Sequence, residues 1–231
     1  MLRNRIALIT GASRGIGQAV AVRFAKEGAH VILVARNSKG LEETDDLIRA
    51  HGGSSTLVPL DLTEFSKIDD LARQVNARFG KLDILVGNAA ILGELTPLPH
   101  MAASDWDKVM ALNVTANFHL IRCFDALLKL SDQPRALFVT SGVTLRATAF
   151  WSAYTTSKAA LEAMVKTYAS ENVKTPLRVN VIDPGRTRTR MRASAFPGED
   201  PMALPAPEYI ADLFVKLAGA DVTDTGGVFG R

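Results

Sequence analysis

A tyrosine and a lysine, Tyr154 and Lys158, stand four residues apart in a segment where we expect a helix to begin near Ser152. Side chains at positions i and i+4 share one face of a helix, so the ammonium of Lys158 can reach the phenol of Tyr154. A free phenol has a pKa of about 10, and a neighbouring cation favours the phenolate. The pair indicates a group that exchanges protons nearer neutrality, and the alternative is an ordinary solvated helix face.

Two further polar side chains could assist such chemistry. Ser141 follows an apolar run at 136–140, and the carboxyl ends of parallel strands are where open sheets bind ligands, so its hydroxyl could hold a substrate oxygen. An ordinary turn residue is the alternative. Asn113 is a poor helix former inside a long helix that we predict from Ser104, on its S-x-x-D capping pattern, to about Leu130. Its amide could hold a backbone carbonyl or a water, or mark a kink.

A glycine-rich turn follows the first predicted strand and has the sequence Thr10-Gly11-Ala12-Ser13-Arg14-Gly15-Ile16-Gly17. Glycine permits the tight turn that brings backbone close to a dinucleotide pyrophosphate. The helix that we expect to start near Ile16 would direct its free N–H groups at the phosphates. The alternative is a merely structural turn.

The elements that position these residues alternate along the chain. Short apolar runs predict strands at 6–9, 31–34, 55–59, 84–86, 136–140 and 178–182, with helical spacing between them. Nearly continuous apolar strands are typical of a parallel sheet covered on both faces. We therefore predict an α/β fold: one Rossmann-like domain over residues 1–231, with a doubly wound parallel sheet. Residues 184–207 read as a long loop, which we expect to be a substrate lid.

The composition favours an ordinary globular protein. The chain has 231 residues, 47% of them hydrophobic and 22% charged, and a net charge of +3. The single cysteine, Cys123, is expected to be a small buried hydrophobe, and the four histidines are too scattered for a metal site. Neither a signal peptide nor an apolar run of about 18 residues is recognisable, so we expect a cytoplasmic protein without a membrane span.

Together these residues resemble the short-chain dehydrogenase/reductase family, and the resemblance runs in chain order from Ile6 to about Phe229. The resemblance implies a catalytic tetrad of Asn113, Ser141, Tyr154 and Lys158. In it Tyr154 is the acid or base, Ser141 orients the carbonyl, Lys158 tunes Tyr154 and binds the nicotinamide ribose, and Asn113 holds a relay water. It also implies a homodimer or homotetramer formed through the helices around Asn113 and Tyr154.

The resemblance further places the cofactor on a defined set of residues. Asp61 and Leu62 look like the adenine contact, and Pro184-Gly185 with Thr187 and Thr189 looks like the segment beside the nicotinamide. The contacts that we expect are Thr10, Gly11, Ser13, Arg14, Gly15, Ile16, Gly17, Arg36, Asp61, Leu62, Asn88, Ala89, Ala90, Tyr154, Lys158, Pro184, Gly185, Thr187 and Thr189.

Two departures from the family pattern are visible. Gly87-Asn88-Ala89-Ala90 replaces Asn-Asn-Ala-Gly after the fourth strand, and we expect Ala90 to need a left-handed backbone conformation there. The sequence also ends at Arg231, earlier than is usual in the family, which leaves open how the substrate pocket closes.

The end of the second strand indicates which cofactor binds. An acidic residue there would hold a ribose 2′-hydroxyl, but this chain has Ala35 and Arg36. Arg36, with Arg14 from the glycine turn, can instead pair with a 2′-phosphate. NADP(H) is therefore the expected cofactor, NAD(H) is the second choice, and two solvated arginines are the alternative.

The predicted function is hydride transfer between NADP(H) and a small-molecule carbonyl or alcohol, a 3-oxoacyl thioester being one candidate. A dinucleotide-binding regulatory protein without turnover is an alternative, although binding alone would require neither Ser141 nor Tyr154. A basic nucleic-acid binder is a third, for which a net charge of +3 is too small. Phe150 and Trp151 either line the substrate pocket or pack in the core. Arg186, Arg188, Arg190 and Arg192 alternate with Thr187, Thr189 and Met191, which in an extended segment would form a basic stripe. The stripe either favours anionic or carrier-linked substrates or is a solvated or subunit-contacting edge.

Overall fold

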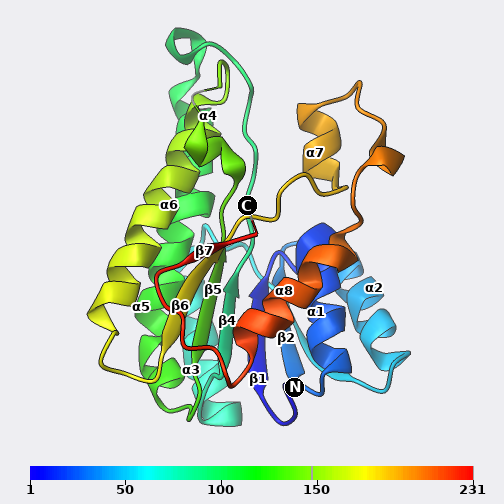
Figure 1. Cartoon of the computed structure of the whole chain (residues 1–231), viewed down its shortest axis with the longest axis vertical. Coiled ribbons are helices and arrows are strands. Elements are labelled where there is room, and N and C mark those ends of the chain that lie inside the picture. The colour runs from blue at the N-terminus through cyan, green and yellow to red at the C-terminus, as the bar shows by residue number, and fades with distance from the viewer. Residues whose placement is uncertain (147, 231) are drawn as a thin grey trace.

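Seven parallel strands form one sheet at the centre of the molecule (Figure 1). The structure is a computed structural model and describes residues 1–146 and 148–230. The strand order is β3-β2-β1-β4-β5-β6-β7, and every neighbouring pair is parallel. The strands are β1 (Ile6–Thr10), β2 (His30–Ala35), β3 (Ser54–Pro59), β4 (Ile84–Gly87), β5 (Arg135–Val139), β6 (Arg178–Ile182) and β7 (Val228–Phe229).

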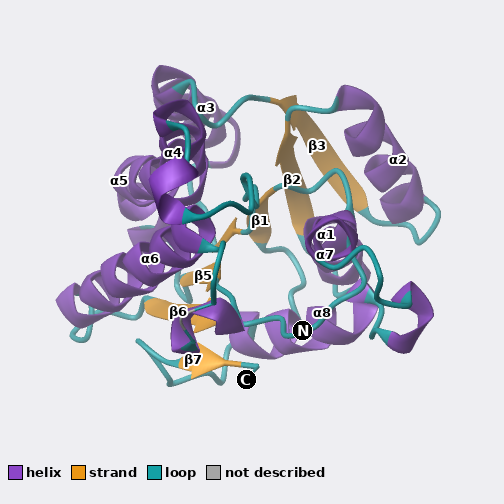
Figure 2. Cartoon of the chain, turned by 90° about the horizontal axis from the view of Figure 1, so that it is seen from above, coloured by secondary structure: helices purple, strands orange, loops and turns teal. Residues whose placement is uncertain are grey.

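Helices cover both faces of this sheet (Figure 2). One face carries α1 (Gly15–Lys26), α2 (Ser38–Arg49) and α8 (Pro207–Ala218). The other carries α3 (Phe65–Phe79), α4 (Ala103–Met110), α5 (Ala116–Lys129) and α6 (Ser152–Glu171). Short 3-10 segments lie at Leu98–His100, Gly142–Leu145 and Pro201–Ala203. The predicted doubly wound α/β fold is confirmed.

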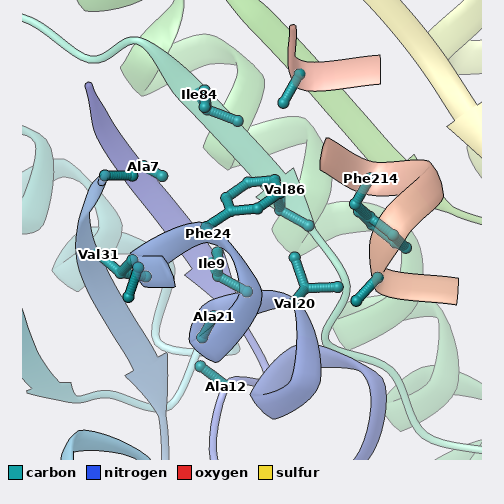
Figure 3. Packing of buried hydrophobic residues seen from close by; sticks show 14 of the residues in the cluster. Ala7, Ile9, Ala12, Val20, Ala21, Phe24, Val31, Ile84, Val86 and Phe214 are labelled. Carbon is teal, nitrogen blue, oxygen red and sulfur yellow. The ribbon is translucent and has the colours of Figure 1, made fainter. Parts of the chain in front are cut away.

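The strands are apolar throughout because each contributes to two cores. Successive side chains of a strand point to opposite faces, so Ile9 of β1 packs in the cluster under α1 and α8 whereas its neighbour Leu8 packs in the cluster under α3, α5 and α6. Figure 3 shows Phe24 of α1 lying among Ile9, Val31 and Val86. Each such fully buried side chain contributes about 1.5–3 kcal/mol to stability, so packing on both faces holds the helices to the sheet.

The strand β7 at the edge of the sheet is absent from the sequence-based prediction. It is two residues long and pairs Val228 with Val181 and Phe229 with Ile182 of β6. A two-residue strand has no measurable alternation of polar and apolar residues, so only its pairing with β6 identifies it.

The long helix predicted from Ser104 differs in two ways. It begins at Ala103, with Ala102 at the N-cap position and no side-chain cap, so Ser104 lies inside the helix and the predicted cap is wrong. A π-helical turn, Ala111–Thr115, then separates α4 from α5. Asn113 lies in this wider turn, and π turns of this kind are frequent at functional sites.

The segment 184–207 contains regular structure that the sequence-based prediction missed. Residues Arg190–Ala195 form the short helix α7, and the hydroxyl of Thr189 caps it by accepting a hydrogen bond from Arg192 N over 3.1 Å. Arg190 and Arg192 therefore lie on a helix, and the predicted extended stripe of four arginines is wrong. Helix α7 lies beyond the carboxyl ends of the strands, above α1 (Figures 1 and 2).

In the part of the chain that the structure describes, no helix combines the length and the apolar character needed to cross a membrane.

Candidate functional site

A cleft of about 1300 Å³ lies at the carboxyl ends of the strands. Its walls come from the turns that follow β1 to β6, from the start of α6, and from α7. In parallel sheets this edge is where neighbouring loops diverge and leave room for a ligand. Segments that are far apart in the sequence therefore meet around one cavity.

The glycine turn after β1 forms one wall of the cleft. Its glycines are required for different structural reasons. Gly11 has a φ of +67°, and a Cβ there would lie 2.8 Å from Asn88 Nδ2. A Cβ on Gly17 would lie 2.3 Å from the carbonyl oxygen of Gly11, so α1 can pack against the turn only without one. Arg14, at the N-cap of α1, makes no side-chain cap, so side chains do not block the N–H groups that begin this helix. This backbone fits a pyrophosphate, because nothing in the first turn of the helix opposes a negative charge.

Thr10 lies behind this wall and ties β1 to the turn after β4. Its hydroxyl donates to Val86 O over 3.1 Å and accepts from Asn88 N over 2.9 Å and from Ala89 N over 3.1 Å. Asn88 Nδ2 in turn donates to Thr10 O over 2.8 Å. Thr10 and Gly17 therefore shape the turn from outside the cleft, whereas the other predicted cofactor contacts line it.

Ala90 lines the cleft without the left-handed conformation predicted for it. Among the non-glycine residues that the structure describes, only Asn4 and Phe150 have a positive φ. The expected strain at Ala90 is therefore wrong, and the turn after β4 accepts alanine in an ordinary conformation.

Arg36 and Asp61 meet at the far end of the cleft, after β2 and β3. Arg36 Nη1 lies 3.4 Å from Asp61 Oδ2, and the arginine side chain is 65% exposed. Burial alone would raise the pKa of Asp61, but the Thr63 main chain and hydroxyl, together with Arg36, lower it below its usual value. A long, exposed ion pair is worth little, so this arginine can turn toward another anion.

Sequence reasoning missed two neighbours of this end, Asn37 and Leu60, which also line the cleft. Asn37 directly follows Arg36 and stands at the N-cap position of α2. An amide side chain between a predicted strand end and a helix start was the signal that could have identified it.

Ser141, Tyr154 and Lys158 lie together on the wall at the centre of the cleft. Lys158 Nζ lies 5.7 Å from the centroid of the Tyr154 ring and donates a hydrogen bond to Val139 O over 2.8 Å. Burial lowers the pKa of Lys158 to about 8. Helix α6 thus places both side chains on one face, as their spacing predicted.

The pKa of Tyr154 moves opposite to the sequence-based expectation. Burial raises it to about 12, interaction with the Ser141 side chain lowers it, and the nearby carboxylate of Asp183 raises it. The ammonium of Lys158 lies against the ring face and is directed at Val139 O. The loss of water around the phenol is therefore the main cause of its raised pKa.

Asn113 is brought to the neighbourhood of the cleft without lining it. Its Oδ1 accepts from Ile91 N over 2.9 Å, and its Nδ2 donates to Ile91 O over 2.9 Å and to Ser157 Oγ over 3.0 Å. The fully buried amide thus joins the loop after β4 to α6. Of the two ligands expected for this amide, it therefore holds a backbone carbonyl, and these contacts occupy the side chain that the family resemblance assigned to a relay water.

Aromatic residues flank the other end of the cleft. Trp151 lines the cleft with its ring centroid 6.0 Å from that of Tyr154 and 5.6 Å from that of Phe196. Phe150 is 55% exposed and is not part of the lining, so it belongs neither to the pocket nor to the core. This end of the cleft is apolar and lies close to the phenol.

Arg192 is held by α7 and the residues after it. Its guanidinium lies 3.6 Å from the centroid of the Phe196 ring, and it forms a two-pronged ion pair with Glu199, with N···O distances of 2.5 and 2.7 Å. A guanidinium in such a pair is not available to recognise an anionic substrate.

The turn after β6 completes the cleft. Gly185, with a φ of +62°, donates its N–H to Asp183 Oδ1 over 3.0 Å, and the hydroxyl of buried Thr187 donates to Pro184 O over 2.8 Å. The methyl group of Thr189 lies close to Gly15, and a Cβ added to that glycine would be 3.6 Å from it. The chain after β6 therefore faces the glycine turn across the cleft.

Cys123 lies away from the cleft on α5. It is half-buried, where a buried hydrophobe was expected, and its Sγ donates to Asp69 Oδ1 over 2.9 Å. Burial, with the Asp69 carboxylate, raises the pKa of this thiol to about 11. Within residues 1–146 and 148–230, no three His, Cys, Asp or Glu side chains gather in a way that could hold a metal ion.

The sequence model of one protein family, described as short chain dehydrogenase, matches residues 5–200. The chain is 38% identical over 224 residues to the Escherichia coli K12 protein named uncharacterized oxidoreductase YciK, an alignment that covers 96% of this chain and 88% of that protein. It is 36% identical over 245 residues to the rhamnolipids biosynthesis 3-oxoacyl-[acyl-carrier-protein] reductase of Pseudomonas aeruginosa, covering 98% and 94%.

A solved structure supports the same comparison. A chain from Shigella flexneri 2a, described as a short chain dehydrogenase complexed with NADP, superposes with a TM-score of 0.95 at 39% identity, covering 99% of this chain and 97% of that one. Similarity at this level extends over the whole sheet and the cleft at its carboxyl edge.

Proposed function

Since the chain belongs to the short-chain dehydrogenase/reductase family and is an enzyme of that family, we propose that it transfers a hydride between NADP(H) and the carbonyl or alcohol group of a small molecule. One observation carries the proposal: Ser141, Tyr154 and Lys158 line the same cleft as the glycine turn. Binding a dinucleotide requires neither Ser141 nor Tyr154, so their presence in the cleft argues for turnover and against a regulatory protein.

The cleft fits the cofactor. The glycine turn and the open end of α1 would hold the pyrophosphate, and Lys158 would bind the nicotinamide ribose. Arg14 and Arg36 line the end where a 2′-phosphate would lie, and the two guanidiniums favour it over a hydroxyl. The solved Shigella flexneri relative contains NADP, which supports the phosphorylated cofactor. When bound, the nicotinamide would supply or accept the hydride.

The protein's own contribution is to move one proton and to orient the carbonyl. In the reductive direction the phenol of Tyr154 donates its proton to the substrate oxygen, while the Ser141 hydroxyl holds that oxygen in place. With a pKa of about 12 the phenol is protonated at neutral pH, so the resting site is ready to act as an acid. Lys158, held by Val139 O, then stands beside the phenolate that forms.

The substrate proposal has two candidates. An apolar carbonyl compound fits the wall that Trp151 and Phe196 form. A 3-oxoacyl thioester is the second candidate, and the relative from Pseudomonas aeruginosa named for that reaction favours it. For assembly we propose a homodimer or homotetramer through the helices that carry Asn113 and Tyr154, which light scattering tests.

A panel of aldehydes, ketones and 3-oxoacyl thioesters tests the proposal by NADPH oxidation. At least one class should be reduced, and Tyr154→Phe should lower turnover by orders of magnitude while the far-ultraviolet circular dichroism stays unchanged. Near-native turnover in Tyr154→Phe would contradict the proton-transfer role. NADPH binding without reduction of any class would favour the regulatory protein.

A further inference from the structure

A buried carboxylate lies on α6 one turn beyond Lys158. Glu162 is 7% exposed. Its Oε1 accepts hydrogen bonds from Thr140 Oγ1 and from Thr144 Oγ1, each over 2.8 Å. Its other oxygen faces Lys166 Nζ at 3.4 Å. The carboxylate of Glu162 therefore links α6, the helix that carries Tyr154 and Lys158, to the residues that follow β5.

The two threonines bracket Ser141. Thr140 precedes it and is fixed to the sheet by its N–H, which donates to Ile182 O over 2.8 Å. Thr144 follows three residues later, and its N–H and hydroxyl lie 3.1 and 3.2 Å from Ser141 O. Ser141 Oγ accepts from Val143 N at a longer 3.5 Å and also interacts with the phenol of Tyr154. The place of the serine hydroxyl relative to that phenol therefore depends on how firmly the backbone on the two sides of Ser141 is held.

A carboxylate at this place has a specific consequence. Ionised, it accepts hydrogen bonds and donates none, so both threonine hydroxyls must donate to it, which fixes their rotamers. Burying an ionised carboxylate is costly unless such donors surround it. A leucine or methionine would pack the same space at lower cost but would leave the turn Gly142–Leu145 without this anchor.

We propose that Glu162 is a positioning residue for Ser141: through Thr140 and Thr144 it fastens the turn after β5 to α6 and so sets the serine hydroxyl against the phenol of Tyr154. The inference rests on the proposed function, because it concerns the group that orients the carbonyl. Misplacement of an orienting group by about 1 Å lowers turnover by roughly a hundredfold.

A double-mutant cycle tests this proposal with 4-nitrobenzaldehyde and NADPH as the probe reactants. Glu162→Met should lower kcat roughly tenfold to a hundredfold, whereas Glu162→Gln, which keeps an acceptor oxygen, should retain most of it. In the Ser141→Ala background Glu162→Met should cause no further loss, because its effect passes through the serine. The dissociation constant of NADPH, measured by fluorescence, should stay within about twofold in Glu162→Met and Glu162→Gln, because Glu162 does not line the cleft.

A matched control separates positioning from general stability. Asp45 of α2 is another buried carboxylate, and it accepts a hydrogen bond from the Ser55 hydroxyl over 2.5 Å. It lies outside the cleft. Asp45→Asn should lower the melting temperature and leave kcat unchanged. If Glu162→Met behaves in the same way, or if its loss simply multiplies with that of Ser141→Ala, the positioning role is overturned.

Two further outcomes are distinguishable. A full kcat in Ser141→Ala alone would overturn the role of the serine in the proposed function, and with it the positioning role. If the probe aldehyde is not reduced, the crystal structure of Glu162→Met tests the positioning role instead. A displaced turn Gly142–Leu145 with an altered Ser141 to Tyr154 distance supports the proposal, and an unchanged turn overturns it.

Discussion

Replacing Lys158 with methionine should change the stability of the protein in a way that depends on pH. Lys158 is 2% exposed, and burial lowers its pKa from 10.5 to about 8. Each pKa unit corresponds to about 1.4 kcal/mol, so the buried charge costs the folded state about 3 kcal/mol when the lysine is protonated in both states. Methionine is similar in length and uncharged, and it removes this cost.

The sign follows from the protons bound in each state. Below pH 8 both states hold the proton and the full cost is present. Between pH 8 and 10.5 the folded chain has lost the proton and the unfolded chain has kept it, so the free energy of unfolding of the native protein rises with pH. The stability of Lys158→Met relative to the native protein should therefore fall by about 3 kcal/mol across this window.

One structural contact offsets the gain without changing its pH dependence. The hydrogen bond from Lys158 Nζ to Val139 O is worth about 1–3 kcal/mol and is lost in the variant. Methionine does not titrate, so the pKa values of Lys158 in the folded and unfolded states alone set how the difference in stability changes with pH, and the lost bond only lowers its overall level. The slope against pH, and not the value at one pH, is therefore the quantity to measure.

Urea unfolding followed by tryptophan fluorescence, repeated from pH 7 to pH 10.5, measures this slope. Lys174→Met, which removes an exposed lysine, is the control and should run parallel to the native protein. Parallel curves for Lys158→Met and the native protein would refute the reasoning, since they would mean that the buried ammonium is not destabilised.

The other predictions concern the cofactor, the glycine turn and the segment over the cleft. Arg36→Ala should weaken NADPH binding by about 1.5–3 kcal/mol, the range of a charge-assisted hydrogen bond, and should barely affect NADH; calorimetry of both cofactors measures this, and equal native affinities would exclude selection of the phosphate. Gly17→Ala places a Cβ 2.3 Å from Gly11 O and should lower the free energy of unfolding by about 1–3 kcal/mol. Gly198→Ala places its Cβ in open space and should not lower it. Similar urea midpoints for the two variants would contradict the packing argument. Residues 184–207, which we expect to act as a substrate lid, should gain protection from hydrogen exchange when NADPH binds, and unchanged protection would rule out ordering.

Much of the fold was predictable because its signals are local. Apolar runs without alternation indicate strands buried on both faces, and the helical segments between them indicate crossovers, so a doubly wound parallel sheet follows from the order of the residues alone. The glycines of the turn after β1 were recognisable from their place between a strand and a helix. Tyr154 and Lys158 were recognisable as a pair because they lie four residues apart on one helix. The structure places both on the same wall of the cleft.

Other features depended on partners far away in the sequence. Asn113 could be marked as unusual, but only packing showed its amide joined to Ile91 and Ser157. Arg36 meets Asp61, 25 residues away, and Arg192 turns toward Glu199 because α7 forms. The edge strand β7 exists only through its pairing with β6.

The proton chemistry of the site shows the difference most clearly. The sequence alone determined that a phenol and an ammonium share one face of a helix, because helical geometry sets that spacing. Only the tertiary structure decided the direction of the Tyr154 pKa, because it buries the phenol and brings the Asp183 carboxylate near. Desolvation is produced by every element that packs around a group, so no local pattern of residues contains it.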